Sequence, residues 1–248
     1  MMTPRGTKDT RGMRLDAYLA RAGLASRREA RGLIRQGAVR VDGEPCLDVQ
    51  RRVRSERVTL GEAEVESPAA QTDFLLNKPA GVSCSHDERE SPLVFDLLDE
   101  GLRRRGLQIA GRLDRATTGL LVLTTDGDFI HRLTHPTRKV PKRYRIHFEG
   151  ELAGDAVSRC RRGLLLGSDE RPLRPAELVL EGEGRATMVI REGRTHQVRR
   201  MIRALGGEVI GLHRDRFGAL DLPADLEPGA LRPLDPGARA LLLSESSL

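Results

Sequence analysis

An uninterrupted apolar run in the middle of the chain, LLVL at residues 120–123, places the strongest constraint on the fold. Within the segment TGLLVLTTDGDF it predicts a buried strand that closes on a hairpin at Asp126 and Gly127. A second apolar run, FLL at residues 74–76, predicts another buried strand. Buried strands need covering layers, and a chain of 248 residues is long enough to supply them in one large domain or two smaller ones.

Other segments of the body predict helices. SPLVFDLLDEGL predicts a short helix, and HQVRRMIRALG predicts a helix that buries Val198, Met201 and Ile202 at helical spacing. His131 and His135 lie four residues apart, a spacing that can bind zinc. Because no third ligand is evident, we expect these two histidines to be polar members of a helix.

The first 60 residues contain a compact pattern of two helices and a hairpin. MRLDAYLARAG carries apolar side chains at helical spacing and ends at a glycine. In ASRREARGLIRQG, Ser26 and Glu29 have the spacing of a capping box, and a glycine again ends the helix. The alternating segment AVRVDGEPC predicts a hairpin that turns at Asp42 and Gly43.

The excess positive charge of the chain lies in the same region. The formal net charge is +6, and residues 1–60 carry 14 Lys and Arg against 7 Asp and Glu. The second predicted helix places Arg27, Arg31 and Arg35 at successive turns, with Arg28 beside them. We expect this stripe to bind nucleic-acid phosphates, and the alternative is an ordinary solvated face.

Several classes of protein are disfavoured. Cys46, Cys84 and Cys160 are isolated, so neither a disulfide framework nor a zinc ribbon is predicted, and we expect a reducing, cytoplasmic location. Residues 1–12 lack the apolar segment of a signal peptide and are expected to be a disordered basic lead. No run of 18 apolar residues predicts a membrane span. Residues 61–72 are small and acidic and predict a linker.

Asp114 lies in the loop GRLDRATTG, just before the apolar run. The simplest function of such an aspartate is to cap a loop or turn. Catalytic groups also occur in loops that a rigid neighbouring strand holds in place. The residue and its position alone leave both interpretations open.

Several long motifs, in order along the chain, resemble those of the pseudouridine synthases. GRLDRATTGLLVLTTDGD is similar to the catalytic loop of that family. NKPAGVSCS, VPKRYRIHFEGEL and REGRTHQVRRMIRALGGEV resemble its first catalytic-domain strand, its Tyr-bearing strand and its late basic motif. Before them, RLDAYLARAGLASRREA and GAVRVDG resemble the S4-like RNA-binding domain. The resemblance covers about residues 13–236. Within the family, the motifs most resemble those of the bacterial ribosomal subfamily that carries an N-terminal S4-like domain.

The resemblance implies an α+β fold with two domains. A small S4-like RNA-binding domain occupies residues 13–60, the linker follows, and residues 73–240 form a catalytic domain around a central mixed, largely antiparallel sheet. The absence of a repeated βαβ rhythm agrees with that architecture.

The resemblance also implies an enzyme that isomerises uridine in ribosomal RNA to pseudouridine. No atom is lost and no redox change occurs, so no cofactor and no metal are expected. Asp114 is the expected catalytic carboxylate, acting at C1′ or C2′ of the ribose. Tyr144 matches the tyrosine that stacks on the target base, and Arg199 matches the cation that pairs with the aspartate.

The remaining expected contacts are with RNA. Flipping the target uridine out of its stack is expected to involve Arg112. Besides the arginine stripe, the other residues expected to bind RNA are Lys78, Arg194, His196 and Gln197. The sequence THQ and the later LHR resemble the small-subunit members of the family. We therefore expect the target to be 16S rRNA, as free RNA or in an incompletely assembled subunit. The protein is expected to be a monomer.

Three alternatives stay open. GRTHQ also occurs in a separate large-subunit family, so the target is alternatively in 23S rRNA. The chain could instead be a non-catalytic RNA-binding ribosome-assembly factor that keeps the fold. It could also be a glycoside hydrolase that uses Asp114 and Asp126, which requires both carboxylates to face one bond.

Overall fold

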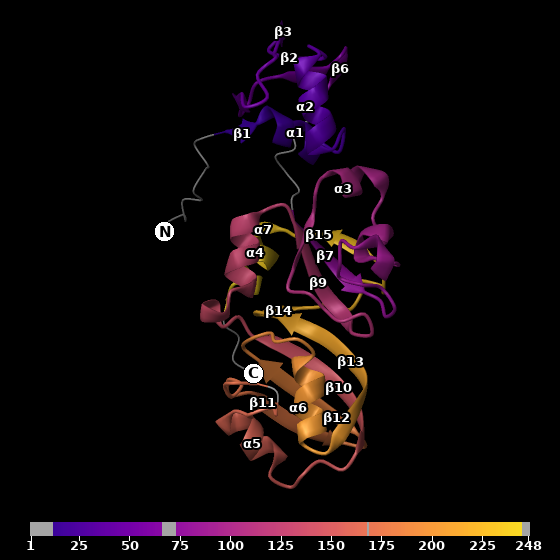
Figure 1. Cartoon of the computed structure of the whole chain (residues 1–248), viewed down its shortest axis with the longest axis vertical. Coiled ribbons are helices and arrows are strands. Elements are labelled where there is room, and N and C mark those ends of the chain that lie inside the picture. Colours follow the sequence, from indigo (N-terminus) through magenta and orange to yellow (C-terminus); the bar gives the residue numbers. More distant parts are fainter. Residues whose placement is uncertain (1–11, 66–72, 168, 245–248) are drawn as a thin grey trace. The chain divides into compact units, whose positions relative to one another are not determined.

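The computed structural model describes residues 12–65, 73–167 and 169–244, which form two compact units (Figure 1). The first unit comprises the chain up to residue 72 together with Leu98–Leu107, and the second comprises the rest. Residues 1–11 of the predicted lead and 66–72 of the predicted linker lie outside the described residues. No helix in the described ranges has the length and apolar character needed to cross a membrane.

The first unit contains two helices and short antiparallel strands, as the sequence predicts. Its elements before residue 66 are β1 (Met13–Arg14), α1 (Leu15–Arg21), α2 (Arg27–Arg35), β2 (Val39–Val41), β3 (Glu44–Pro45), β4 (Arg52–Val53), β5 (Val58–Leu60) and β6 (Ala63–Glu64). The strand order of the larger sheet is β3-β2-β5-β6, and β1 pairs with β4. The helices pack on the sheet through Leu15, Leu19, Ile34 and Val39, which are all fully buried.

Local sequence signals account for these elements. Ser26 Oγ accepts a hydrogen bond from the Glu29 backbone N–H at 3.2 Å, and the Ser26 N–H donates to the Glu29 carboxylate at 2.7 Å, which completes the predicted capping box. Asp42 and Gly43 have φ values of 52° and 87°, as the two-residue hairpin turn requires.

Strand β6 lies inside the segment that was predicted to be a linker. Ala63 and Glu64 pair with β5, and Val65 is buried in the core of the first unit. The acidic, small-residue composition hides this strand because only Val65 anchors it by burial. Its other contacts are backbone hydrogen bonds, which any sequence can form, and an exposed ion pair between Glu64 and Arg57.

The second unit is built around a nine-stranded mixed sheet. Its strands are β7 (Asp73–Lys78), β8 (Gln108–Ala110), β9 (Thr118–Thr124), β10 (Lys142–Gly150), β11 (Glu177–Gly182), β12 (Arg185–Ile190), β13 (Gly207–Phe217), β14 (Leu220–Asp221) and β15 (Leu231–Pro233). The main path runs β11-β12-β10-β13-β9-β7-β15, with β8 on β9 and β14 on β13. Among the strand pairs of the described residues only β9 and β13 run parallel, which confirms the largely antiparallel sheet.

Short helices surround this sheet. They are η1 (Glu88–Glu90), η2 (Val94–Leu97), α4 (Gly127–Thr134), η3 (Pro136–Arg138), α5 (Ala156–Arg162), α6 (Gln197–Ala204) and α7 (Pro236–Leu242), and α3 (Glu100–Arg104) belongs to the segment grouped with the first unit. Helix α6 buries Val198, Met201 and Ile202, as its periodicity predicts. The single helix predicted for SPLVFDLLDEGL is instead two pieces, because the Asp99 side chain caps a new helix at Leu102 N–H.

The hairpin predicted at Asp126 is wrong. After β9 the chain enters helix α4, and Asp126 Oδ1 accepts a hydrogen bond from the Phe129 backbone N–H at 3.0 Å as the N-cap. Asp-Gly can start a helix as well as a hairpin. Here Phe129 and Leu133, four residues apart, are both buried in the sheet core, which selects the helix.

The parallel contact between β9 and β13 depends on Gly119. Its φ is +104°, and a Cβ atom at this position would lie 2.3 Å from the Arg214 carbonyl oxygen. Any side chain would therefore push the two strands apart where they meet at Thr118 and Gly119.

We expect Gly119→Ala to lower the free energy of unfolding by about 3 kcal/mol or more, at the upper end of single substitutions. The matched control is Gly127→Ala at the start of α4, where a Cβ meets nothing within 4 Å. The control should change stability by less than about 1 kcal/mol. Urea denaturation of both variants tests this, and equal transition midpoints would contradict the steric argument.

Candidate active site

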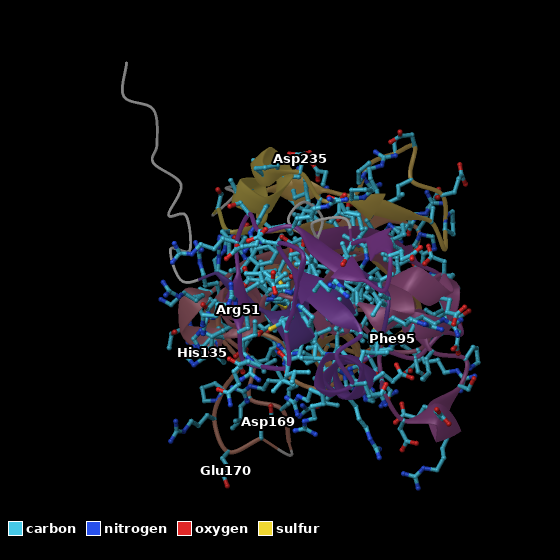
Figure 2. The ribbon with its side chains drawn as sticks, turned by 90° about the horizontal axis from the view of Figure 1, so that it is seen from above. Arg51, Phe95, His135, Asp169, Glu170 and Asp235 are labelled. Carbon is cyan, nitrogen blue, oxygen red and sulfur yellow. The ribbon has the colours of Figure 1, made fainter. Side chains whose placement is uncertain are left out.

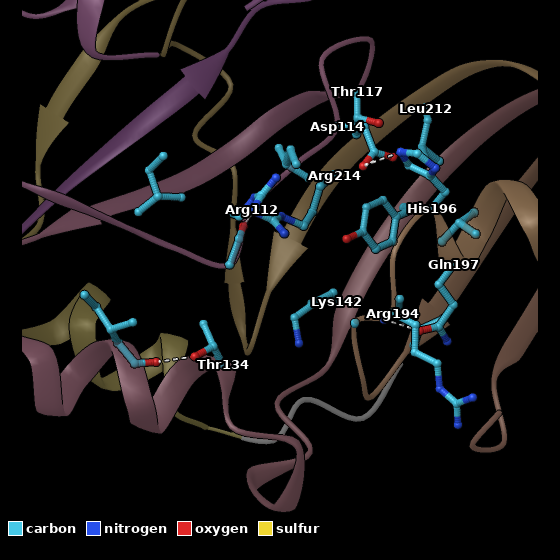
Figure 3. Close-up of a pocket in the computed structure, with 18 residues that line it drawn as sticks. Arg112, Asp114, Thr117, Thr134, Lys142, Arg194, His196, Gln197, Leu212 and Arg214 are labelled. Carbon is cyan, nitrogen blue, oxygen red and sulfur yellow. Dashed lines mark hydrogen bonds and ion pairs between the residues drawn. The ribbon is translucent and has the colours of Figure 1, made fainter. Parts of the chain in front are cut away.

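A pocket of about 390 Å³ lies in the second unit, between the loop that precedes β9 and the strands β10 and β13 (Figure 3). Its polar lining consists of Arg112, Asp114, Thr117, Thr134, Lys142, Tyr144, Arg194, His196, Gln197 and Arg214. Its apolar lining includes Ile109, Leu113, Ile130, Ile190, Val198 and Leu212. A cavity that combines apolar walls with convergent polar and charged groups is typical of a small-molecule or nucleoside site.

Asp114 stands in the loop between β8 and β9. The loop is turned by a hydrogen bond from the Thr117 N–H to the Asp114 carbonyl at 3.0 Å, and Leu113 is buried beside it. The Asp114 side chain is 34% exposed, and its Oδ1 lies 3.6 Å from His196 Nε2. This is its only ion pair within the described residues, and Figure 3 marks it with a dashed line.

Tyr144 comes from the middle of β10 and is 7% exposed. Lys142 lies two residues earlier on the same strand, so both side chains project from the same face of the sheet. Both line the pocket together with Asp114. The predicted catalytic carboxylate and aromatic ring are thus brought to one cavity.

Arg214, on β13, is a site residue that sequence reasoning missed. It is 1% exposed. Its Nε donates to the Leu120 carbonyl at 2.8 Å, and its Nη2 donates to the Gly111 carbonyl at 2.8 Å. No carboxylate pairs with it among the described residues. Arg214 therefore fastens the start of the Asp114 loop to β9. The available signal was a charged residue two positions after Leu212 in LHRDRF, where a strand places both side chains on the same face.

Lys142 is the second functional candidate that sequence reasoning missed. The residue is 8% exposed, and its Nζ donates to the Val140 carbonyl at 3.0 Å and lies 5.1 Å from the Phe217 ring centroid. Burial, and to a smaller extent the nearby Arg214 guanidinium, lower the pKa of Lys142 to about 8, while Glu192 acts in the opposite direction.

The predicted RNA contact of Lys78 is wrong. Lys78 is 0% exposed, and its Nζ donates to the carbonyls of Pro79, Arg115 and Thr117 at 2.9, 3.2 and 2.8 Å. All three donors of the ammonium group are therefore used inside the protein. Burial lowers the pKa of Lys78. Its function is to tie the turn after β7 to the Asp114 loop.

Arg199 does not form the predicted pair with Asp114. It is the third residue of α6, and its Nη1 donates to the Val209 carbonyl on β13 at 3.0 Å. Arg199 is not part of the pocket lining, whereas Arg112, which is exposed, is. The cations that line the pocket near Asp114 are thus Arg112, Lys142 and Arg214, together with Arg194.

Arg194 and Gln197 line the pocket but have protein partners. Arg194 Nη1 pairs with Asp169 at 2.8 Å, and its guanidinium also donates to the carbonyls of Arg171 and Pro172. Asp169 lies on the loop between α5 and β11 (Figure 2). Gln197 accepts from the Arg194 N–H at 2.9 Å and donates to Glu192 at 3.2 Å. Their roles in RNA binding stay predictions.

The arginine stripe on α2, in the first unit, is divided by its partners. Arg31 Nε pairs with Asp16 at 3.0 Å, and Asp16 is almost fully buried. Burial raises the pKa of Asp16, but hydrogen bonds from Arg31 and Arg14 outweigh it and hold that pKa below its usual range. The other three arginines of the stripe are exposed, and within the described chain no ion pair engages them.

Asp126 and the pair His131 and His135 do not line the pocket. Asp126 caps α4 and pairs with Arg239, and it does not line the pocket of Asp114. The glycoside-hydrolase alternative therefore lacks its second carboxylate. His131 lies in α4 and His135 ends it, with ring centroids 4.5 Å apart. Within the described ranges, no group of three potential ligands is placed to hold a metal ion.

Comparisons with known families match both units. Residues 73–204 match the family model described as RNA pseudouridylate synthase, and residues 13–58 match that of the S4 domain. Residues 73–204 are thus the part of the chain that contains Asp114, Tyr144 and the rest of the pocket up to α6.

Individual relatives extend this similarity over nearly the whole chain. The ribosomal small subunit pseudouridine synthase A of Haemophilus influenzae is 37% identical over 223 residues, which is 90% of this chain and 96% of the relative. Those of Vibrio parahaemolyticus and Escherichia coli are 40% and 38% identical with the same coverage. A crystal structure of a pseudouridylate synthase aligns with a TM-score of 0.65 at 34% identity, covering 93% of this chain and all of the other.

The burial of Lys142 generates a stability prediction. Its pKa is about 8 in the folded chain against 10.5 as the reference value. Between these values the unfolded chain binds more protons than the folded chain, so stability rises with pH in this window. Lys142→Met removes this contribution. We expect the unfolding free energy of the natural chain, relative to Lys142→Met, to increase between about pH 8 and about pH 10. Urea denaturation across this range measures it, and parallel curves would contradict the lowered pKa.

Proposed function

This chain belongs to the RNA pseudouridylate synthase family, and from that premise we propose that it isomerises one uridine of 16S ribosomal RNA with Asp114 as the catalytic carboxylate. That it is a pseudouridine synthase follows from the family, from the relatives and from the solved structure. The choice of 16S RNA rests on relatives named for the small ribosomal subunit, which match along both the S4 and the catalytic parts.

The observation that carries the role of Asp114 is its place in the pocket. A partly exposed carboxylate stands in a fixed loop at a cavity that also holds Tyr144. The reaction breaks the glycosidic bond, rotates the base and rejoins it through C5. Asp114 attacks C1′ of the ribose, or removes a proton from C2′, and both routes need an ionised carboxylate held close to the sugar.

The neighbouring side chains position the substrate. The Tyr144 ring stacks on the target base, which its burial in the cavity wall permits. Arg112 is exposed beside the Asp114 loop and contacts the RNA from which the uridine is flipped. His196, 3.6 Å from Asp114 Oδ1, keeps the carboxylate turned toward the pocket.

The first unit supplies affinity for RNA. Arg27, Arg28 and Arg35 are exposed on one side of α2 and bind backbone phosphates. Arg31 has a different task, because its pair with the buried Asp16 holds α2 against α1. A uridine that must leave its stack is most accessible in free RNA or in an incompletely assembled subunit, which is therefore the proposed substrate.

We expect Asp114→Asn to reduce turnover by more than about 1,000-fold while RNA binding and the urea unfolding midpoint stay nearly unchanged. The two side chains are almost the same size, and only the ionisable oxygen is lost. In a strain that lacks the gene, pseudouridine mapping of both rRNAs should show one missing site in 16S rRNA. The natural gene should restore it, and the Asn variant should not.

Either of two results would contradict this proposal. Normal modification by the Asn variant would exclude Asp114 as the catalytic carboxylate. A site missing from 23S rRNA, with 16S rRNA unchanged, would exclude the small-subunit target. The proposed catalytic role of Asp114 would be unaffected by that result.

The RNA-binding role of α2 is tested by the triple variant Arg27→Gln, Arg28→Gln, Arg35→Gln. We expect weaker RNA binding and a salt dependence whose slope falls by about 2, because each phosphate bound on a single strand contributes about 0.7 to that slope. Arg161→Gln with Arg162→Gln on α5 is the control, because both arginines are exposed on the second unit. Filter binding at several salt concentrations measures both, and equal slopes would show that the stripe is only a solvated face.

A further inference from the structure

We propose that Lys142 is a catalytic residue of this site, whose ammonium group binds the uracil anion that is released when the glycosidic bond breaks. The proposal rests on the proposed function, because it assumes that the reaction takes place beside Asp114. It adds a cation to the site at a position that the sequence motifs had assigned only to a strand.

The pocket contains two buried cations, Lys142 and Arg214, that no described carboxylate pairs with. Lys142 is more than nine-tenths buried, and its Nζ has one hydrogen-bond acceptor, the Val140 carbonyl. Within the described residues no carboxylate forms an ion pair with it. Arg214, still more deeply buried, also lacks a carboxylate partner and disfavours the Lys142 ammonium. Asp114 is the only acidic side chain in the described lining of the cavity, and no described carboxylate pairs with either buried cation, so the cavity favours a further anion.

The positions of the exposed and the buried side chains indicate which kind of anion each of them binds. Arg112 and His196, at the same pocket, are exposed, whereas Lys142, Tyr144 and Arg214 are buried. Backbone phosphates are permanently charged and strongly hydrated, so they suit the exposed arginine and histidine. Lys142 projects from the same face of β10 as Tyr144, the residue proposed to stack on the base. The buried ammonium therefore faces the base rather than the phosphate.

The chemistry of isomerisation supplies the required anion. When the C1′–N1 bond breaks, its electron pair stays with uracil, and the negative charge spreads over N1, O2 and O4. Asp114 at the same time forms a bond to C1′, or takes a proton from C2′. The rotated base then attacks C1′ through C5, the bond to Asp114 breaks or the C2′ proton returns, C5 loses its proton and N1 gains one.

Lys142 keeps its proton throughout this sequence. Its ammonium group donates a hydrogen bond to a carbonyl oxygen of uracil, and this bond strengthens as charge develops on the base. Such a donor in a desolvated site accelerates the bond-breaking step without tightening substrate binding. The step needs no co-reactant beyond the RNA and the side chains of the pocket.

The pH dependence follows from the surroundings of Lys142. The charged and titratable groups that face it around the pocket are Arg112, Asp114, Tyr144, Arg194, His196 and Arg214, with Glu192 nearby. Burial and Arg214 lower the pKa of Lys142 to about 8. Loss of one proton above that pH removes the positive charge and leaves a weaker hydrogen-bond donor, so the rate of the natural enzyme should fall there.

The test compares Lys142→Met and Lys142→Arg in the full chain, with Lys139→Met as the control. Lys139 is exposed in the turn before β10 and does not line the pocket. Steady-state rates on an rRNA substrate are measured between about pH 6.5 and pH 9, together with urea unfolding midpoints. We expect Lys142→Met to lower kcat by about 100-fold or more with KM changed less than about threefold. Lys139→Met should match the natural enzyme.

Lys142→Arg distinguishes a catalytic cation from a structural one. It keeps the charge at every pH tested, so we expect partial recovery of kcat and no loss of rate above about pH 8. If both variants lose activity equally, lower the unfolding midpoint equally and keep the natural pH profile, the proposal is overturned and Lys142 is structural. A raised KM and a smaller salt slope with unchanged kcat would overturn it in favour of a phosphate contact.

The Asp114→Asn and Lys142→Met variants together distinguish a failure of this inference from a failure of the proposed function. An inactive Asp114→Asn variant combined with a fully active Lys142→Met variant overturns this inference alone. Turnover by Asp114→Asn overturns the proposed function and, with it, the role of Lys142.

Discussion

The position of the candidate catalytic loop depends on one buried guanidinium. Arg214 crosses from β13 to the Leu120 carbonyl on β9 and to the Gly111 carbonyl at the start of the Asp114 loop. It does so where the two strands run parallel for only two residue pairs, at the close approach that Gly119 allows. The guanidinium is planar and permanently charged, so it presents its donors in fixed directions, whereas a lysine ammonium turns on a flexible stem. After Asp114 along the chain, the carbonyls of Arg115 and Thr117 accept hydrogen bonds from Lys78. The loop is thus fastened before and after Asp114 by cations that bind its backbone.

Structural features that depend on residues a few positions apart can be predicted well from the sequence. The capping box at Ser26, the turn at Asp42 and the buried face of α6 depend on residues a few positions apart, and the structure contains all three. The α+β fold and the shared pocket of Asp114 and Tyr144 could be predicted only through the resemblance of long motifs. No periodicity or composition brings two residues 30 positions apart to one cavity. A two-residue signal such as Asp126 with Gly127 is ambiguous by itself, and burial of Phe129 decides it.

The basic residues could not be sorted from sequence, because their roles depend on partners far along the chain. Lys78 and Lys142 both occur in strand-forming segments. Lys78 donates hydrogen bonds to three backbone carbonyls, whereas Lys142 lines the pocket. Arg31 looks like its neighbours on α2 until Asp16, 15 residues away, is placed beside it. Arg199 directly follows Gln197 and Val198, which line the pocket, but its guanidinium donates to the Val209 carbonyl instead. In each case tertiary structure selects among donors that the sequence presents as equivalent.

The cations of the two units therefore act in different dielectric environments. On α2 the unpaired arginines stand in water, where salt screens their attraction for phosphate within about 10 Å at 0.1 M. In the pocket, Lys142 and Arg214 are buried, so their fields are screened little by water. Ionic strength should consequently act on how tightly RNA is held rather than on bond breaking. An arginine-rich composition cannot reveal this division, since exposed and buried guanidiniums count equally in the net charge. The division arises only when the sheet buries some of them and the helix leaves the others in solvent.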